Sequence, residues 1–278
     1  TSTPFGRDAQ MFDSSFGWRF INPKMQELYG TDAMGETAEN LADLYKINRE
    51  DQDKFAYNSQ HKAAKAAAAG RFEKEIIPVA IPQKKKTGAQ NPEPLQFAND
   101  EFIKANTTLE GLAALRPAFR KTGTVTAGNS SGLNDGAAAL LLASEAGMKK
   151  YSLKPLARIV SSAIVGVEPR IMGIGPVEAS NKALKKAGLT FDKIDIIELN
   201  EAFAAQSLSC IRQWGLADDD ARINPNGGAI AIGHPLGMSG ARILNSAAIE
   251  LHEKNKRYAL VTLCIGVGQG YAAVIEKV

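Results

Sequence analysis

The sequence is poor in the residues that build disulfide frameworks, metal centres and membrane spans. Its 278 residues include two cysteines and three histidines. Two cysteines are too few for a disulfide framework, and neither residue type clusters at metal-ligand spacing. No apolar run approaches the roughly 18 residues of a membrane helix. We therefore expect a soluble, cytoplasmic protein that holds no metal and contacts no membrane.

The sequence also lacks an excess of charge of one sign. It has 33 basic and 30 acidic residues, a formal net charge of +3. These charges are scattered, whereas a nucleic-acid surface requires a concentrated basic face, so we expect no nucleic-acid partner. Residues 1–4 contain no initiator Met and no signal-peptide pattern. We expect a targeting signal to be absent or to lie upstream of residue 1.

The first part of the chain, up to about residue 124, is polar and favours helix. A stretch rich in Ala, Lys, Asp and Gln runs from residue 37 to 69 and stops at Gly70, which predicts a long helical segment. Residues 84–94 combine lysines with Pro and Gly, which predicts an exposed loop or hairpin tip. We interpret this part as an excursion that contributes no strand to a sheet core.

From about residue 156 the pattern changes to apolar, strand-like runs that alternate with amphipathic stretches. The runs cover residues 157–165, 194–199 and 258–263. This alternation predicts a layered α/β arrangement. A composition of 44% hydrophobic and 23% charged residues is globular, and the length suits one large domain or two of ordinary size.

A first candidate for chemistry is Asn200. Residues 194–199 form an apolar run that stops at Asn200, and an Ala-rich helical pattern follows. Side chains at such a strand-to-helix corner face ligands in α/β proteins. The alternative is that Asn200 caps the helix, with Glu201 in its first turn, and the spacing alone favours this alternative.

A second candidate is His234, which lies in a segment, residues 224–242, that is dense in glycine. Glycine lets the backbone approach a ligand closely, at an entropic cost that a purely structural loop tends to avoid. A helix start is expected near Ser239. The alternative is an ordinary surface or hydrogen-bonded histidine.

A third candidate is Cys264, at the end of a strand-like run. Alternating glycines follow it, and then a second strand-like run at residues 271–275. A dinucleotide fingerprint requires a helix after the strand, so we reject a nicotinamide site. Cys210 lies in a helix-like run and fits an inert, buried filler. Cys264 fits proton transfer or nucleophilic attack at least as well as filling.

A fourth candidate is the polar loop at residues 124–136, which leads into an apolar helix expected from residue 137 to 143. Its hydroxyls and amides suit a polar ligand. The alternative is a capping loop, with Asn134 or Asp135 near the start of the helix.

Four of these sequences together resemble the motif set of the thiolases, in the right order. They are N-E-A-F-A at Asn200, G-H-P at His234, C-I-G at Cys264 and A-G-N-S-S-G-L-N-D-G-A-A at residues 127–138. The resemblance extends from end to end of the chain. It implies the α/β thiolase fold with layers in the order αβαβα.

The resemblance also assigns the parts of that fold. Residues 1–132 resemble the loop domain that binds coenzyme A, residues 133–152 the last helix of the N-terminal domain, and residues 153–278 the C-terminal domain. The family's first segment, which holds the nucleophilic cysteine, has no counterpart, and neither Cys210 nor Cys264 matches that residue. We therefore expect residues 1–278 alone to be catalytically inactive.

The resemblance implies four catalytic roles. His234 resembles the group that activates the nucleophilic thiol, and Cys264 the second, acid/base cysteine. Asn200 resembles the residue that holds a catalytic water and forms one oxyanion hole with His234. The backbone N–H of Gly266 resembles a donor in the other oxyanion hole.

Further positions resemble binding residues. Ser131 matches a position that contacts the pantetheine arm, and Lys104 stands where many relatives have an arginine near the nucleotide. Met172 and Phe203 resemble residues of the acyl pocket. Coenzyme A would be a co-substrate and not a permanently bound cofactor. The family also implies a homodimer or homotetramer.

Different segments of the chain resemble thiolases of different acyl specificity. Residues 17–23, 172–176 and 233–240 resemble 3-oxoadipyl-CoA thiolases of aromatic-compound breakdown, which form succinyl-CoA and acetyl-CoA. Arg19 is our candidate partner for the distal carboxylate of that substrate. Residues 100–104 and 115–119 look more like acetoacetyl-CoA enzymes. The alternatives are an acetoacetyl-CoA or fatty 3-oxoacyl-CoA thiolase, or a non-catalytic thiolase-like protein that binds coenzyme A or lipid.

Overall fold

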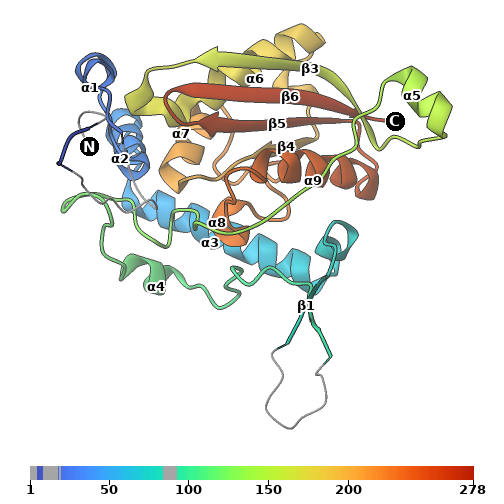
Figure 1. Ribbon diagram of the computed structural model, residues 1–278, viewed down its shortest axis with the longest axis horizontal. Coiled ribbons are helices and arrows are strands. Elements are labelled where there is room, and N and C mark those ends of the chain that lie inside the picture. Colours follow the sequence, from blue (N-terminus) through green and yellow to red (C-terminus); the bar gives the residue numbers. More distant parts are fainter. Residues whose placement is uncertain (1–4, 9–17, 19, 84–92) are drawn as a thin grey trace.

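The structure is a computed structural model that describes residues 5–8, 18, 20–83 and 93–278 (Figure 1). The elements before the main sheet are α1 (Pro23–Tyr29), α2 (Met34–Tyr45), α3 (Arg49–Ala68), η1 (Arg71–Lys74), β1 (Val79–Ile81), β2 (Leu95–Phe97), α4 (Leu109–Ala113) and α5 (Glu145–Tyr151). The sheet and its helices follow as β3 (Ala157–Gly166), η2 (Pro169–Ile174), α6 (Gly175–Ala187), η3 (Phe191–Lys193), β4 (Ile196–Leu199), α7 (Ala204–Gln213), α8 (Ala229–Ile232), α9 (Ser239–Glu253), β5 (Tyr258–Ile265) and β6 (Gln269–Lys277).

The three predicted strand runs are confirmed as β3, β4 and β5. With β6 they form a four-stranded sheet in the order β3-β6-β5-β4, in which only β4 and β5 are parallel. Helix α6 packs on one face of the sheet and α9 on the other (Figure 1). The described residues before β3 add no strand to this sheet. The predicted layered α/β architecture is therefore confirmed.

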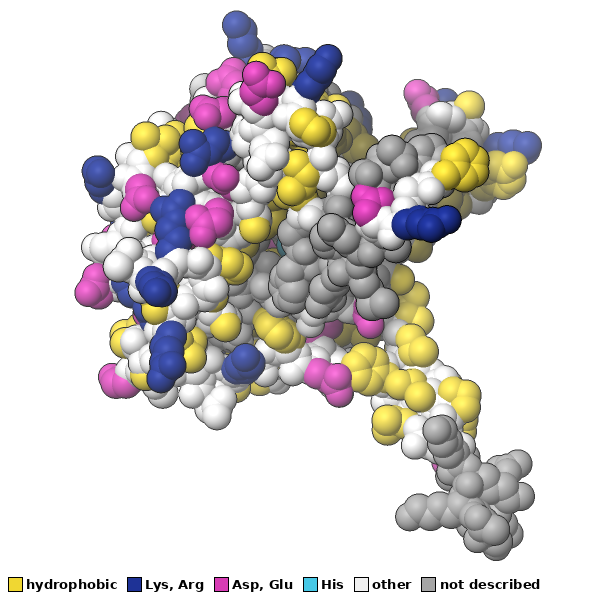
Figure 2. Space-filling model, turned by 60° about the vertical axis from the view of Figure 1, so that its left-hand side comes forward, with side chains coloured by type: hydrophobic (Ala, Val, Ile, Leu, Met, Phe, Trp, Pro, Cys, Tyr) yellow, Lys and Arg dark blue, Asp and Glu magenta, His cyan; other side chains and the backbone are white. Residues whose placement is uncertain are grey.

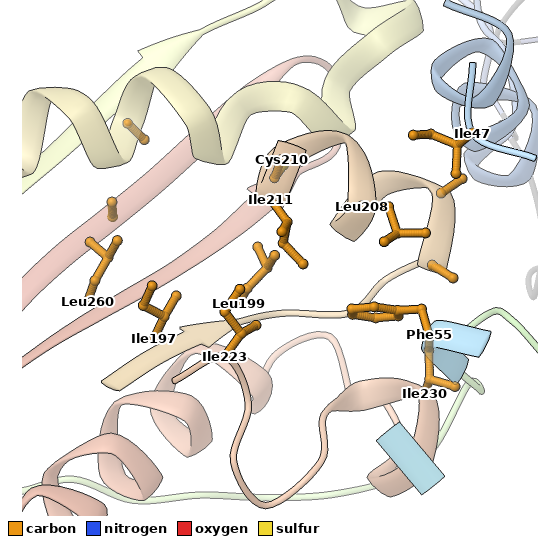
Figure 3. Packing of buried hydrophobic residues seen from close by; sticks show 14 of the residues in the cluster. Ile47, Phe55, Ile197, Leu199, Leu208, Cys210, Ile211, Ile223, Ile230 and Leu260 are labelled. Atoms are coloured by element: carbon orange, nitrogen blue, oxygen red, sulfur yellow. The ribbon is translucent and has the colours of Figure 1, made fainter. Parts of the chain in front are cut away.

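The sheet buries apolar side chains on both of its faces. Ile197 and Leu199 of β4 point into the cluster shared with α6 and α7 (Figure 3). Ile196 points the opposite way and packs with Ile243 and Leu251 of α9. Alternate residues of a strand face opposite sides, so a short apolar run on a doubly covered strand contributes to two cores. Each fully buried Leu or Ile stabilises the fold by about 1.5–3 kcal/mol.

The long helical segment expected at residues 37–69 is divided into α2 and α3. Lys46 has a φ of 56°, in the left-handed region that ends a helix. Asn48 then begins α3, because its side-chain oxygen accepts a hydrogen bond of 2.7 Å from the backbone N–H of Asp51. The second helix stops before Gly70, where the sequence predicted the end.

Strands β1 and β2 form an antiparallel hairpin that extends away from the body of the molecule (Figure 1). The predicted hairpin tip lies mostly outside the described residues, since residues 84–92 are not described. Hydrophobic side chains gather along this arm (Figure 2). The exposed ones are Val79, Ile81, Leu95 and Phe97.

The helix expected at residues 133–152, with an apolar part at residues 137–143, begins only at Glu145. Residues 132–144 have no regular structure, and Leu141 and Leu142 are 78% and 71% exposed. A helix of this length owes most of its stability to packing of its apolar face. No described part of the chain covers these leucines, so the apolar pattern alone does not produce a helix here.

Buried polar contacts join η1 to α9. Arg71 donates to Glu250 at 2.9 Å and to Glu75 at 2.9 Å, while Ser246 donates to Glu75 at 2.6 Å. Glu250 also accepts from Asn226 at 2.8 Å. These contacts hold the start of the 224–242 segment between the early helices and the sheet. No helix in the described residues is long and apolar enough to cross a membrane.

Candidate active site

Two of the predicted catalytic residues lie at the ends of the parallel strands β4 and β5. Leu199 pairs with Thr262, and the backbone N–H of Asn200 donates to the Thr262 carbonyl at 3.0 Å. Cys264 lies two residues further along β5. The carboxyl ends of parallel strands meet at one sheet edge, where α/β proteins place ligand-binding groups. The strand pairing therefore brings Asn200 and Cys264 to the same edge.

The side chain of Asn200 contacts His234 and does not cap a helix. Helix α7 begins at Ala204 after Phe203, and no side chain caps its start. The Asn200 side chain is fully buried, and its Nδ2 lies 3.3 Å from His234 Nε2. The capping alternative for Asn200 is therefore wrong, because a turn of three residues separates it from the helix.

The partners of His234 determine which of its ring nitrogens carries the proton. The hydroxyl of Ser239 donates to the carbonyl of Pro235 at 3.0 Å, so its oxygen accepts the Nδ1–H of His234 at 2.7 Å. The lone pair is then on Nε2, which accepts from the Nδ2 of Asn200. A neutral imidazole with this tautomer has its basic nitrogen at the strand ends.

Burial lowers the pKa of His234 below its ordinary value of 6.5, and the positive charge of Arg242 adds to this effect. Both effects disfavour the imidazolium. His234 is therefore neutral near pH 7 and able to accept a proton at Nε2.

Cys264 is 8% exposed and packs with Met172, Ala202 and Phe203. The sequence predicted three of these four residues as neighbours of the chemistry, and the structure brings them together. Burial raises the pKa of the Cys264 thiol to about 12. A thiol with this pKa is protonated at neutral pH, which suits a proton donor better than a resting nucleophile.

Cys210 lies in the core and not at the strand ends. It is fully buried, and its thiol donates to the Gly173 carbonyl at 3.3 Å. Burial raises the pKa of this thiol as well. This environment agrees with the inert, buried filler that the sequence indicated.

The glycines of the 224–242 segment bring the backbone close to protein, which differs from the expected close approach to a ligand. A Cβ on Gly228 would lie 2.2 Å from the Glu201 carboxyl carbon, and one on Gly233 2.5 Å from Asn134 Oδ1. Gly227, with a φ of 78°, lies against the backbone of Ser59. Packing between helices and loops therefore explains these glycines. Gly237 faces open space.

Gly266 lies in the turn between β5 and β6, two residues after Cys264. Val267 and Gly268 continue the turn with φ values of 67° and 91°. A Cβ on Gly266 would meet no atom within 4 Å, so its backbone borders open space. The strand that follows is β6, which agrees with our rejection of a dinucleotide fingerprint.

Two residues of the polar loop contact the site from a third direction. The Ser131 hydroxyl donates to the Ala202 carbonyl at 3.0 Å. Asn134 Oδ1 accepts from the backbone N–H of His234 at 3.4 Å. No helix begins at Asn134, so its expected capping role is wrong. Sequence reasoning missed its contact with His234, and it also missed Ser239, whose position near a helix start was the available signal.

Lys104 lines a cleft of about 160 Å³. The cleft lies between α4, residues 127–128 and Ile230, next to the segment that leads to His234. The Lys104 ammonium lies 5.2 Å from the centre of the Phe102 ring. Arg19 lies outside the described residues. Among the described residues, no group of three or more His, Cys, Asp or Glu side chains has a geometry that holds a metal ion.

The sequence matches two family models. The model of the thiolase N-terminal domain matches residues 11–146, and the model of the thiolase C-terminal domain matches residues 153–277. Together they cover most of the chain, with a gap at the segment around α5.

Curated relatives and solved structures agree with these matches. The chain is 57% identical to a beta-ketoadipyl-CoA thiolase of Acinetobacter baylyi, over 99% of its own length and 67% of the relative's. It is 54% identical to the 3-oxoadipyl-CoA/3-oxo-5,6-dehydrosuberyl-CoA thiolase of Escherichia coli, over 100% of its own length and 68% of the relative's. The chain thus spans about two thirds of the length of these relatives.

Two solved structures have the same fold. The acetyl-CoA acetyltransferase of Bacillus anthracis superposes with a TM-score of 0.86 at 41% identity, over 99% of this chain and 67% of that one. Human mitochondrial 3-ketoacyl-CoA thiolase in complex with CoA superposes with a TM-score of 0.83 at 46% identity, over 89% and 60%. With matching domains, relatives and fold, the chain belongs to the thiolase family of acyltransferases.

Proposed function

We propose that the chain carries the acid/base and oxyanion-binding groups of a thiolase that splits a 3-oxoacyl-CoA with coenzyme A. The observation that carries this proposal is the hydrogen-bonded series Asn200, His234 and Ser239, at the strand ends that also hold Cys264. A partly buried, neutral imidazole held by Asn200 and a buried, protonated thiol at the end of β5 supply one base and one acid.

In the proposed reaction, a nucleophilic cysteine attacks the 3-oxo carbon and transfers its proton to His234 Nε2. The C2–C3 bond then breaks, and the departing acetyl-CoA enolate takes a proton at C2 from Cys264. The thiol of coenzyme A finally gives its proton to the Cys264 thiolate and attacks the acyl-cysteine. The shortened acyl-CoA leaves, and the released cysteine thiolate recovers its proton from His234. Well-placed acid and base groups of this kind contribute about 10²–10⁴ each in rate.

We assign the nucleophilic attack to a cysteine other than Cys210 and Cys264. Cys210 is enclosed in the core, and the raised pKa of the Cys264 thiol keeps that side chain protonated. A nucleophilic thiol requires the opposite, a lowered pKa or an adjacent base. The described residues therefore supply the partners of the nucleophile.

Asn200 and Gly266 are our candidates for stabilising negative oxygen atoms. Asn200 Oδ1 is buried and has no hydrogen-bond partner within the described part of the chain. A buried acceptor of this kind is stabilised by a donor such as a water molecule, which Asn200 and His234 would hold together. The Gly266 N–H, beside open space, would serve a second oxyanion. Removing one such donor typically costs about 3–4 kcal/mol.

We propose that coenzyme A enters along the cleft lined by Lys104. A cleft of about 160 Å³ accommodates a part of such a ligand and not all of it. Lys104 would act as a point charge for a phosphate, without the bidentate fork of an arginine. Ser131, beside Ala202, would border the pantetheine arm. A solved relative in complex with CoA supports coenzyme A as the ligand.

We propose 3-oxoadipyl-CoA as the substrate, because relatives at 57% and 54% identity are named for it or its synonym. Its distal carboxylate requires a cation. Besides Arg19, the described chain offers Arg170, two residues before Met172 of the acyl pocket. Arg170 Nε contacts Asp32 at 3.0 Å, and 54% of its side chain remains exposed.

The substrate proposal is tested by comparing kcat/KM for 3-oxoadipyl-CoA, acetoacetyl-CoA and a medium-chain 3-oxoacyl-CoA. The enzyme would be the chain joined to the third of the Acinetobacter baylyi relative that the match does not cover. We expect 3-oxoadipyl-CoA to be preferred, and Arg170→Ala to reduce its use by about tenfold or more while sparing acetoacetyl-CoA. Equal or better use of an uncharged substrate by the unmutated protein would overturn the substrate and leave the thiolase assignment intact.

A second candidate function concerns residues 1–278 by themselves. The chain has the cleft but no cysteine suited to attack, which favours binding of coenzyme A without turnover. Calorimetric titration of residues 1–278 with coenzyme A, and an assay of acetoacetyl-CoA thiolysis, separate the two functions. We expect binding and no thiolysis above the buffer rate. Turnover by residues 1–278 would contradict this proposal.

We also propose a homo-oligomer, because the exposed apolar side chains of the β1–β2 hairpin form a patch that isolated soluble domains tend to avoid. Light scattering after gel filtration tests this proposal. A monomer at micromolar concentration would contradict it.

A further inference from the structure

Glu201, the residue after Asn200, is a buried carboxylate surrounded by donors from distant parts of the chain. It is 1% exposed. Its Oε2 accepts from the Ser59 hydroxyl at 2.6 Å and from the backbone N–H of Ile230 at 3.2 Å. Its Oε1 accepts from Asn224 Nδ2 at 2.7 Å. One side chain therefore joins α3, the loop at residue 224 and the first turn of α8.

The packing around this carboxylate leaves no room for adjustment. A Cβ on Gly228 would lie 2.2 Å from the Glu201 carboxyl carbon and 2.4 Å from its Oε1. The backbone N–H of Gly228 donates to the Ser59 hydroxyl at 3.1 Å, so that hydroxyl both accepts and donates. Asn224 is fixed in turn by two hydrogen bonds of 2.9 Å to the backbone of Leu199 in β4.

This arrangement controls both sides of the contact between Asn200 and His234. Glu201 is covalently next to Asn200. Through Ile230 it also fixes α8, which ends at Ile232, two residues before His234. The Asn200 Nδ2 to His234 Nε2 distance of 3.3 Å is near the upper limit for a hydrogen bond, so a shift of a few tenths of an ångström breaks it.

A glutamine in place of Glu201 would not reproduce these contacts. Burial raises the pKa of Glu201, and the three hydrogen bonds that it accepts oppose this effect and favour the ionised carboxylate. An amide turns one of the two oxygens into a donor. In either orientation the amide N–H₂ would face an existing donor, the Asn224 amide or the Ile230 N–H. The change therefore preserves the volume and breaks the network.

We infer that Glu201 is a positioning residue, which holds the 224–234 segment and α3 against the end of β4 so that Asn200 and His234 remain in contact. Its consequence for catalysis rests on the function proposed above. Its consequence for His234 does not, because the geometry of the imidazole is a property of the chain itself.

The inference is tested on residues 1–278 by ¹⁵N NMR of the histidine rings, of which the chain has only three. In Glu201→Gln we expect the pKa of His234 to rise towards 6.5 and the Nε2–H tautomer to become populated, because the imidazole is less buried and loses Asn200. Ser59→Ala removes one donor and is expected to shift both quantities in the same direction by less.

Glu39→Gln is the matched control. Glu39 is also a buried carboxylate, 2% exposed, and accepts from the backbone N–H groups of Thr124 and Val125, both at 2.9 Å. It has no contact with residues 224–234, so we expect an unchanged His234 signal. An unchanged His234 in folded Glu201→Gln, or an equal change in Glu39→Gln, would overturn the inference. If Glu201→Gln does not fold, Ser59→Ala decides by the same readout.

The catalytic consequence is measured on the joined protein described above. We expect Glu201→Gln to lower kcat by about tenfold or more with little change in KM for coenzyme A, and Glu39→Gln to leave kcat within about twofold. A lower kcat/KM that comes only from a higher KM for coenzyme A, with kcat unchanged, would contradict the positioning role. If the unmutated joined protein is inactive, the proposed function fails, whereas the result for the imidazole still stands.

Discussion

Two segments meet at the candidate active site and differ in how far the rest of the molecule covers them. Residues 224–242 are polar and glycine-rich, yet hydrogen bonds with α3, β4 and α9 hold them on several sides. Residues 133–144 are apolar, yet the described part of the chain leaves them largely exposed. They touch where Gly136 lies against Pro235. Hydrophobicity alone therefore does not determine which of the two segments is buried.

The position of a segment depends on hydrogen-bonding groups and packing surfaces elsewhere in the chain, and not on its own composition alone. Asn224, Asn226 and Gly228 of this segment form hydrogen bonds with Leu199, Glu250 and Ser59 respectively, which avoids the cost of unpaired buried groups at these positions. The leucines of residues 133–144 would not stabilise a helix here, because their contribution comes from burial and they remain exposed. Residues 224–242, which have hydrogen-bond partners in other elements, include His234.

The largest effect should come from removing the proposed base, His234 of residues 224–242, or the proposed acid, Cys264 of β5. In the joined protein, we expect His234→Ala and Cys264→Ala each to lower kcat by about 10²–10⁴. Cys264→Ala should still accumulate the acyl-enzyme, because Cys264 acts after the attack. Intact mass spectrometry checks this, and a loss of the acyl-enzyme in Cys264→Ala would contradict the division of roles.

The second effect concerns how tightly residues 224–242 are packed. Gly228→Ala places a methyl group 2.2 Å from the Glu201 carboxyl carbon, and we expect a loss of about 1–3 kcal/mol in the free energy of unfolding. Gly237→Ala, in the same segment but beside open space, is the matched control and should change stability by less than about 0.5 kcal/mol. Urea denaturation measures both, and equal losses would indicate that the segment is not held at Gly228.

The third effect is a pH dependence of the free energy of unfolding that comes from His234. The folded-state pKa of His234 is lowered, so the unfolded chain binds more protons as the pH falls below 6.5. The contribution of His234 to stability is therefore complete above pH 6.5 and is lost as the pH falls through the folded-state pKa. Unfolding measured over a pH series should show a smaller loss on acidification in His234→Gln than in the unmutated chain. The same loss in both would contradict the lowered pKa.

The smallest effect is expected in residues 133–144, whose apolar side chains are exposed. Leu141→Gln should change the free energy of unfolding by less than about 0.5 kcal/mol, because the side chain is already 78% exposed. It should reduce the binding of a hydrophobic dye to residues 1–278. A large destabilisation would show that this segment packs in solution, and the comparison with residues 224–242 would no longer hold.

By itself, the sequence determined the strands β3, β4 and β5, the layered α/β class, and the chemical candidates Asn200, His234 and Cys264. Strand period and local motifs are properties of neighbouring residues, so they can be recognised without the fold. The resemblance to thiolases assigned Met172 and Phe203 to an acyl pocket, and in the structure both pack with Cys264. It did not find the break between α2 and α3, because cap residues compete with an otherwise continuous helical pattern.

The groups that orient the candidate catalytic residues are found only in the tertiary structure. Ser59 and Glu201 are separated by 142 positions, and Asn134 and His234 by 100, so no local pattern reports either contact. It also decided that the glycines before His234 accommodate protein, and that the apolar residues 133–144 remain uncovered. The physical reason is the same for each: burial and hydrogen-bond partners come from elements that only folding brings together.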